Sequence, residues 1–134
     1  MREEVARHLD GARAGLLVIH PVRNYMESPY AGKAFEYMAA GLPLIMSDFP
    51  LMRELFEPLQ CALFVDPLQP AAIAEAMTWI LKNPQQAELM GARGKAAVAT
   101  RFSWQGQATK LLRFYETLMT HSQLQTAGAH AIDA

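Results

Sequence analysis

Three short apolar runs, separated by segments with helical patterns, constrain the fold of this chain more than any other feature. Residues 15–19 read GLLVI, residues 43–47 read PLIMS, and residues 62–65 read ALFV. Runs of this length that are apolar at nearly every position are typical of parallel strands covered on both faces. Strands that alternate with helical crossovers predict a parallel sheet with helices on both sides.

The segments before and between these runs carry helix signals. Apolar residues recur three or four positions apart in residues 2–9 and 32–40, and Gly11 and Gly41 are placed to end these two helices. The intervening residues 22–31 are predicted to form a polar loop that leaves the carboxyl end of the first strand. Ligands bind at that edge of open α/β sheets.

Proline residues mark the start of the later helices. Pro is tolerated in the first helical turn, where its missing N–H is not needed. Helices are therefore predicted over residues 50–56, 70–82 and 84–100. Ser103 is the predicted N-cap of a last helix with one apolar side. The apolar period then ends, and residues 121–134 are predicted to be a disordered tail.

The number of strands limits how much of a domain is present. Three strands are few for a sheet that is covered on both faces, since a complete doubly wound domain usually has about five or six. The predicted fold class is α/β: a partial doubly wound, Rossmann-like parallel sheet of about three strands, with flanking helices and a helical carboxyl-terminal segment. Residues 1–120 are predicted to be the carboxyl-terminal portion of such a domain.

The charge pattern argues against nucleic acid as a partner. The chain of 134 residues has a net charge of −1 and no basic run, whereas binding to a phosphate backbone needs a concentrated Lys and Arg surface. The histidines, at positions 8, 20, 121 and 130, show no metal-ligand spacing. We therefore expect no nucleic-acid partner and no metal site.

The apolar runs and the single cysteine indicate the cellular setting. The longest apolar run, residues 14–19, is far shorter than the roughly 20 residues that span a bilayer. Residues 1–10 are charged and amphipathic, unlike a secretory signal. Cys61 lies in an apolar stretch, which predicts a small buried side chain and no intrachain disulfide. The expected setting is cytoplasmic and without a transmembrane segment, with peripheral attachment at the inner membrane surface as an alternative.

Residues 27–50 combine a polar loop, a short helix closed by Gly41, and a strand. That order places backbone N–H groups and one carboxylate at the edge of a sheet. Gly32 and Glu36 are four positions apart and share a helix face, and glycine lets a ligand approach the backbone closely. Because unpaired N–H groups in a first helical turn favour an anion, this segment suits a phosphorylated ligand.

The same segment resembles a known signature. Residues 33–43, taken with Asn24 and Asp48, are similar to the donor-binding signature of the retaining family-4 glycosyltransferases, which have the GT-B fold. The resemblance extends over about residues 5–118. Further matches in the family's order are Asp66-Pro67, Pro70, Asn83-Pro84, Gly91, Phe102-Ser103-Trp104 and Tyr115.

The resemblance implies roles for several residues in binding the donor. In the family a Glu-x7-Glu motif lies across the loop and the start of the helix, and its second glutamate is matched by Glu36. Glu36 is therefore expected to bind the ribose hydroxyls of a sugar nucleotide. Backbone amides of Ala31, Gly32 and Lys33 are expected to meet diphosphate or donor-sugar oxygens. No catalytic residue is assigned.

Three positions of this site leave alternatives open. The first glutamate of the motif falls at Ser28, where the chain departs from the pattern, and Glu27 is one residue away. Ser28 and Glu27 are therefore both candidates for contact with the donor sugar, the second only if the loop shifts register. Glu36 could instead complement the helix dipole, an effect worth about 0.3–1 kcal/mol. Lys33 could be a solvated surface residue.

The resemblance also implies a reaction. A sugar would pass from a nucleoside-diphosphate sugar, as substrate, to an acceptor with retention and without a cofactor. The amino-terminal, acceptor-binding domain of such enzymes is not in this sequence, so we predict a fragment that is inactive without that domain or a partner chain. One alternative is a noncatalytic nucleotide-binding or protein-interaction module capable of self-association. Another is half of a sugar-nucleotide epimerase domain.

Overall fold

The computed structural model describes residues 2–27 and 32–129, and its internal contacts divide the chain into two units. The first unit, residues 1–99, holds the sheet and its helices, and the second, residues 100–134, holds the last helix. The elements are α1 (Arg2–Asp10), β1 (Gly15–Leu17), α2 (Arg23–Met26), α3 (Gly32–Ala39), β2 (Leu44–Ser47), α4 (Pro50–Phe56), the 3-10 helix η1 (Glu57–Leu59), β3 (Ala62–Val65), α5 (Pro70–Lys82), α6 (Pro84–Thr100) and α7 (Trp104–Ala129).

The three predicted strands form one parallel sheet in the order β1-β2-β3. The second and third strands lie within the predicted runs, whereas the first ends at Leu17, two residues earlier than predicted. Leu17 is in register with Met46, and Met46 with Phe64. The α/β fold class predicted from the sequence, a partial Rossmann-like parallel sheet with flanking helices, is confirmed.

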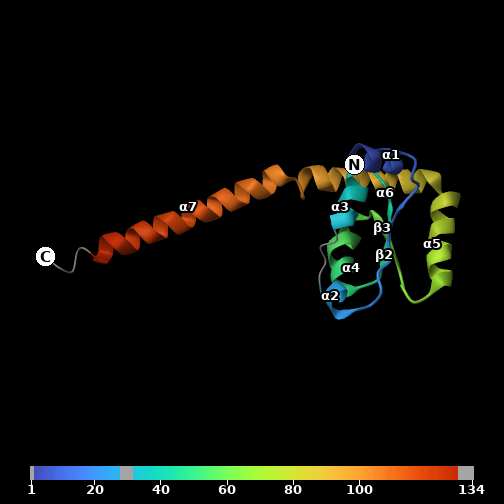
Figure 1. Cartoon of the computed structure of the whole chain (residues 1–134), viewed down its shortest axis with the longest axis horizontal. Coiled ribbons are helices and arrows are strands. Elements are labelled where there is room, and N and C mark those ends of the chain that lie inside the picture. Colours follow the sequence, from blue (N-terminus) through green and yellow to red (C-terminus); the bar gives the residue numbers. More distant parts are fainter. Residues whose placement is uncertain (1, 28–31, 130–134) are drawn as a thin grey trace. The chain divides into compact units, whose positions relative to one another are not determined.

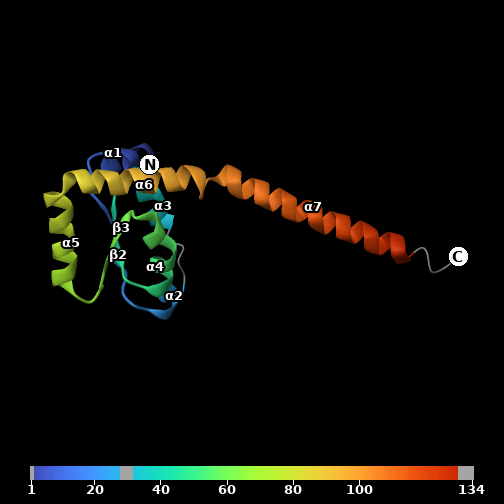
Figure 2. The same cartoon turned by 180° about the vertical axis from the view of Figure 1, so that it is seen from behind.

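Helices cover the sheet from two sides. Figure 1 shows α3 and α4 on one side of β2 and β3 and α5 on the other, and the reverse view in Figure 2 agrees. On the α3 side, Met38, Phe56 and Cys61 are fully buried. Burial raises the pKa of the Cys61 thiol to about 11, so this cysteine is the buried side chain that the sequence predicts. On the α5 side, one cluster contains Ile45, Val65, Ala76, Ile80 and Ala87.

The helix ends follow the predicted local signals. Gly41 has φ +77°, in the left-handed region, and its N–H donates to the Met38 carbonyl at 2.9 Å while the Leu42 N–H donates to the Tyr37 carbonyl at 3.0 Å. These two bonds form a Schellman motif that ends α3 and turns the chain into β2. Pro lies in the first turn of α4 and of α5, as predicted.

Close packing holds α6 against the end of α3. A Cβ atom at Gly91 would overlap the Gly41 carbonyl, and one at Gly94 would lie 3.2 Å from the Met38 side chain. Glycine at position 91 therefore lets the backbone of α6 approach the turn between α3 and β2. This contact fixes α6 in the first unit.

One prediction about an irregular segment is wrong in part. The polar loop predicted over residues 22–31 contains the short helix α2, and residues 28–31 lie outside the described residues. Helix α7 extends to Ala129, within the segment 121–134 for which disorder stays a prediction, and residues 130–134 lie outside the described residues.

Two other predictions concern α7 and membranes. Ser103 caps α7 as predicted, since its Oγ accepts a hydrogen bond from the Gly106 N–H at 3.3 Å. In the part of the chain that the structure describes, no helix combines the length and apolar character needed to cross a bilayer.

Candidate donor-binding site

A buried serine fixes the start of the loop that leads to the predicted site. Ser47, at the end of β2, is 1% exposed. Its Oγ accepts a hydrogen bond from the Ile19 N–H at 2.8 Å and donates one to the Ile19 carbonyl at 3.0 Å. The chain that leaves β1 is therefore held to the carboxyl end of β2, and exposed His20 follows it.

Helix α3 presents the predicted ligand-binding residues at this edge. In a β-α-β crossover the helix returns antiparallel to the strands, so the amino end of α3 lies near the carboxyl ends of β1 and β2. Gly32, Lys33 and Glu36 are exposed, whereas Ala34 and Met38 are fully buried. The buried side of α3 anchors the helix, and the predicted residues lie on its solvent side.

The first turn of α3 offers hydrogen-bond donors. The first four N–H groups of any α-helix have no intrahelical partner, and here they belong to the turn that begins at Gly32. Among the described residues, no hydrogen bond or ion pair engages the side chains of Lys33 or Glu36. One cation, one carboxylate and a set of backbone donors are thus available on a single helix face.

Of the two candidates for the first motif position, the structure describes only Glu27. Glu27 is paired with Arg23, whose Nε donates to Oε1 at 2.8 Å, and both side chains are largely exposed. Exposed pairs at this helical spacing are weak, so Glu27 can exchange this partner for a ligand. Ser28 lies outside the described residues, as does Ala31.

A charge cluster at the end of β2 is a feature that the sequence analysis missed. Arg53 donates two hydrogen bonds to Asp48, at 2.9 and 2.7 Å, and one to Glu57 at 2.5 Å. The Arg53 guanidinium holds the pKa of the Asp48 carboxyl below its usual value, and the two carboxylates raise the pKa of Arg53. The signal was present, because Arg53 and Glu57 are four positions apart in one helix.

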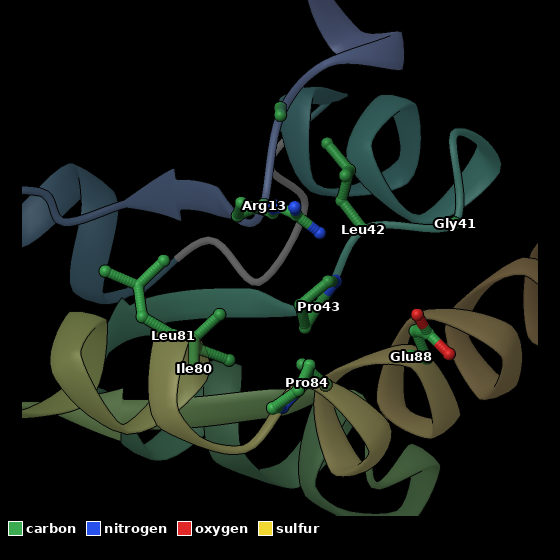
Figure 3. Close-up of a pocket in the computed structure, with 10 residues that line it drawn as sticks. Arg13, Gly41, Leu42, Pro43, Ile80, Leu81, Pro84 and Glu88 are labelled. Atoms are coloured by element: carbon green, nitrogen blue, oxygen red, sulfur yellow. The ribbon is translucent and has the colours of Figure 1, made fainter.

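A cavity of about 360 Å³ lies elsewhere on the sheet. Figure 3 shows Arg13, Leu42, Pro43 and Glu88 around it, where the strands begin. Of the residues predicted for donor binding, none of the four that the structure describes, Glu27, Gly32, Lys33 and Glu36, lines this cavity. The proposed ligand edge and the cavity are therefore separate features, at the carboxyl and amino ends of the strands.

The donor set of the site is that of an anion or hydroxyl ligand. Over residues 2–27 and 32–129, no three His, Cys, Asp or Glu side chains gather in a way that could hold a metal ion. The arrangement around α3 combines backbone N–H groups, an ammonium and one carboxylate. Such groups bind phosphate oxygens and sugar hydroxyls.

Comparison with known proteins gives the site its context. Residues 2–113 match the family described as glycosyl transferase-like. The chain belongs to this family. The match spans the sheet, its helices and the first part of α7, and the resemblance found in the sequence is thereby confirmed.

Individual glycosyltransferases agree with this assignment. The chain is 34% identical over 93 residues to the phosphatidyl-myo-inositol mannosyltransferase of Mycobacterium leprae. This match covers 69% of this chain and 25% of the relative. The chain is 36% identical over 87 residues to the Mycobacterium tuberculosis protein of the same name, covering 62% of this chain and 23% of that one.

A solved structure gives the same answer for the fold. Sucrose-phosphate synthase from Thermosynechococcus elongatus matches with a TM-score of 0.63 and 30% identity over 70% of this chain and 24% of the synthase. The fold is that of a carboxyl-terminal part of a GT-B glycosyltransferase. This chain spans about a quarter of the length of each of these relatives.

Proposed function

We propose that this chain supplies the nucleotide-binding part of the donor site of a retaining glycosyltransferase. One observation carries the proposal: Gly32, Lys33 and Glu36 are exposed together on α3, at the sheet edge where Ser47 holds the outgoing loop. This edge is where open α/β sheets bind nucleotides. The family match and both mycobacterial relatives favour glycosyl transfer over the epimerase alternative.

The charges assign the two parts of the donor to different groups. A diphosphate is attracted by the partial positive charge of the α3 amino end and by Lys33, while the Glu36 carboxylate repels it. Glu36 therefore binds the neutral ribose hydroxyls, as the resemblance implies. During transfer, the same positive groups stabilise the charge that develops on the departing diphosphate.

The chain by itself is a half-site in this proposal. The acceptor and the remaining donor contacts belong to the three-quarters of the relatives that this chain does not match. We therefore expect no transferase activity from the chain alone. Because both relatives are mannosyltransferases, a mannosyl donor is the first sugar to test. Residence in the cytoplasm, or at the inner membrane surface, stays a prediction.

Isothermal titration calorimetry with UDP, GDP and ADP tests the half-site. We expect one nucleotide to bind and its affinity to fall at least tenfold, about 1.4 kcal/mol, in the Glu36→Ala variant. The matched control is Glu75→Ala, which removes an exposed glutamate from α5 on the other side of the sheet. Circular dichroism verifies that both variants fold.

Two results would contradict the proposal. One is equal affinity in wild type and Glu36→Ala, which would leave Glu36 a helix-dipole partner. The other is a folded chain that binds none of the three nucleotides either alone or together with the part of the M. leprae relative that it lacks. That second result would favour the noncatalytic interaction module.

A further inference from the structure

The outer edge of β3 lies beside exposed apolar side chains. Strand β3 pairs with β2 on one side, and the described residues 66–129 that follow it add no further strand to the sheet. Trp79 of α5 is 37% exposed and Leu89 of α6 is 56% exposed, and both line a cavity with Leu63 of β3. Because tryptophan is enriched at protein interfaces, this edge and the α5 face beside it form a candidate docking surface.

Two cavities along this edge carry opposite charges. Their volumes are about 450 and 410 Å³, and both contain Leu63 and Trp79. The first cavity reaches the amino end of β3 and includes Arg93, whereas the second reaches the carboxyl end and includes Asp66 and Glu75. Arg93 and Glu75 are exposed, and among the described residues no hydrogen bond or ion pair engages their side chains. One end of the edge is thus basic and the other is acidic.

The backbone of this edge can pair with a second copy of itself. The carbonyl groups of Cys61 and Val65 accept hydrogen bonds from the β2 segment. Since consecutive residues of a strand point their N–H and C=O groups in opposite directions, those of Ala62 and Phe64 point to the unpaired side. In an antiparallel pair centred on Leu63, Ala62 of each copy lies opposite Phe64 of the other, and each such pair exchanges two hydrogen bonds.

We propose that two copies of this chain dock through β3, antiparallel about a two-fold axis at Leu63, and form one continuous sheet. In a two-fold interface the same surface is used twice. The antiparallel arrangement brings the basic end of one edge to the acidic end of the other. Arg93 of each copy therefore lies beside Glu75 and Asp66 of the other copy, and both grooves are filled.

The helix spacing on the α5 face suits this arrangement. Helix α5 packs on both β2 and β3, so its axis lies between these two strands. With strands about 4.8 Å apart, the axes of the two α5 helices would be about 10 Å apart across the two-fold axis. Helices in contact pack at about 8–10 Å. The second α5 helix would therefore cover Trp79, which a lone extended peptide at the same edge would leave exposed.

The α4 face of the edge limits which strand can pair there. On this face, the Arg53 guanidinium lies over the Phe64 ring and binds Asp48 and Glu57. Glu57 also borders the first cavity, but its carboxylate is already paired. In the proposed register, the residue opposite Phe64 is Ala62, whose small side chain leaves room for the guanidinium. Charges at an edge oppose pairing with arbitrary strands, so the cluster favours a partner with a small residue at this position.

The proposed dimer does not rest on the proposed nucleotide half-site. Helix α3 packs on β1 and β2, away from the β3 edge, and its exposed residues stay accessible in the dimer. Nucleotide affinity is therefore expected to be the same in variants that dissociate the dimer. The two proposals can fail independently.

Sedimentation of the chain over a range of protein concentrations tests the dimer. We expect a reversible equilibrium between monomer and dimer, and we expect Leu89→Glu to weaken the association at least tenfold. The matched control is Leu81→Glu, because Leu81 is a helical leucine that is 65% exposed but borders the cavity of Figure 3 instead of the β3 edge. Circular dichroism verifies that both variants fold.

A charge exchange tests the antiparallel register. Arg93→Glu and Glu75→Arg are each expected to weaken the dimer, because each places like charges beside one another across the axis. The double variant is expected to restore association, since the exchanged charges pair again. In the dimer, the amides of Ala62 and Phe64 are also expected to exchange with solvent more slowly than in the monomer.

Three results would overturn the proposal. One is a folded chain that stays monomeric at all concentrations. Another is a dimer that Leu81→Glu weakens as much as Leu89→Glu does. The third is a double charge variant that associates no better than the single variants, because the ends of the two edges then do not meet as proposed.

Discussion

The two outer edges of this small sheet differ in the side chains that flank them. At the β3 edge, the Arg53 guanidinium lies 4.6 Å above the Phe64 ring and binds Asp48 and Glu57. At the β1 edge, the side chains of Leu16, Met77 and Leu81 are all exposed. Charged side chains are one way in which natural sheets protect solvent edges, and the Arg53 cluster supplies such charges at the β3 edge, beside the exposed Leu89 of α6.

The largest expected effect tests whether the covered face and the open face of the sheet differ in stability. Phe56 is fully buried with its ring 5.9 Å from that of Phe35, so Phe56→Ala is expected to lower the free energy of unfolding by about 3–5 kcal/mol. Leu16→Ala is expected to cost only about 1 kcal/mol, because Leu16 is half exposed. Urea denaturation followed by circular dichroism gives both values, and equal losses would show that β1 is covered after all.

A smaller effect tests how β1 is held when it has a neighbour on only one side. Ser47→Ala removes both hydrogen bonds to Ile19 and leaves partly buried backbone groups unpaired, a loss expected to be about 1–3 kcal/mol. Thr78→Ala removes one hydrogen bond between exposed groups of α5 and is expected to change stability by less than about 0.5 kcal/mol. If the two variants lose the same amount, the Ser47 bonds do not hold the end of β1.

The smallest effect concerns the charged protection of the β3 edge. The hydrogen bonds from Arg53 lower the pKa of Asp48. The ion pair between Asp48 and Arg53 therefore stabilises the fold fully above the ordinary carboxyl pKa of 3.8, and this stabilisation is lost as the pH falls through the lowered pKa. The urea midpoint is expected to be lower at about pH 3 than at pH 6. This decrease is expected to be slightly smaller in the Asp48→Asn variant than in the wild type. The difference is small because both side chains are 41% exposed and solvent screens the pair. A decrease of the same size in the variant would show that Asp48 does not contribute to the pH dependence of stability.

Much of the fold was predictable because its signals are local. A run of apolar residues, a glycine that accepts a positive φ at position 41, and prolines that need no N–H partner each act within a few residues. These signals located the strands and most helix ends. The prediction at residues 22–31 was less successful because a polar segment without an apolar period can still form hydrogen-bonded helical turns.

The candidate site was predictable only as a set of residue types. The pattern around Glu36 predicted which residues share one face of a helix, and the structure shows Gly32, Lys33 and Glu36 exposed together on α3. Their roles in binding a donor stay predictions. The bonds between Ser47 and Ile19 join residues 28 positions apart, and no spacing rule links such a pair before the path of the chain is known.

The sequence by itself determined the order of the helices and strands, the parallel sheet and the glycosyltransferase family. These follow from propensities, periodicity and motif residues, and each of these signals lies within a short segment of the chain. The tertiary structure alone decided which of two adjacent leucines is buried. Leu17 and Leu16 read alike in the apolar run, yet only Leu17 faces a helix, α3, that the described chain supplies. Burial depends on what covers each face of the sheet, and that is fixed by packing between elements distant in the sequence.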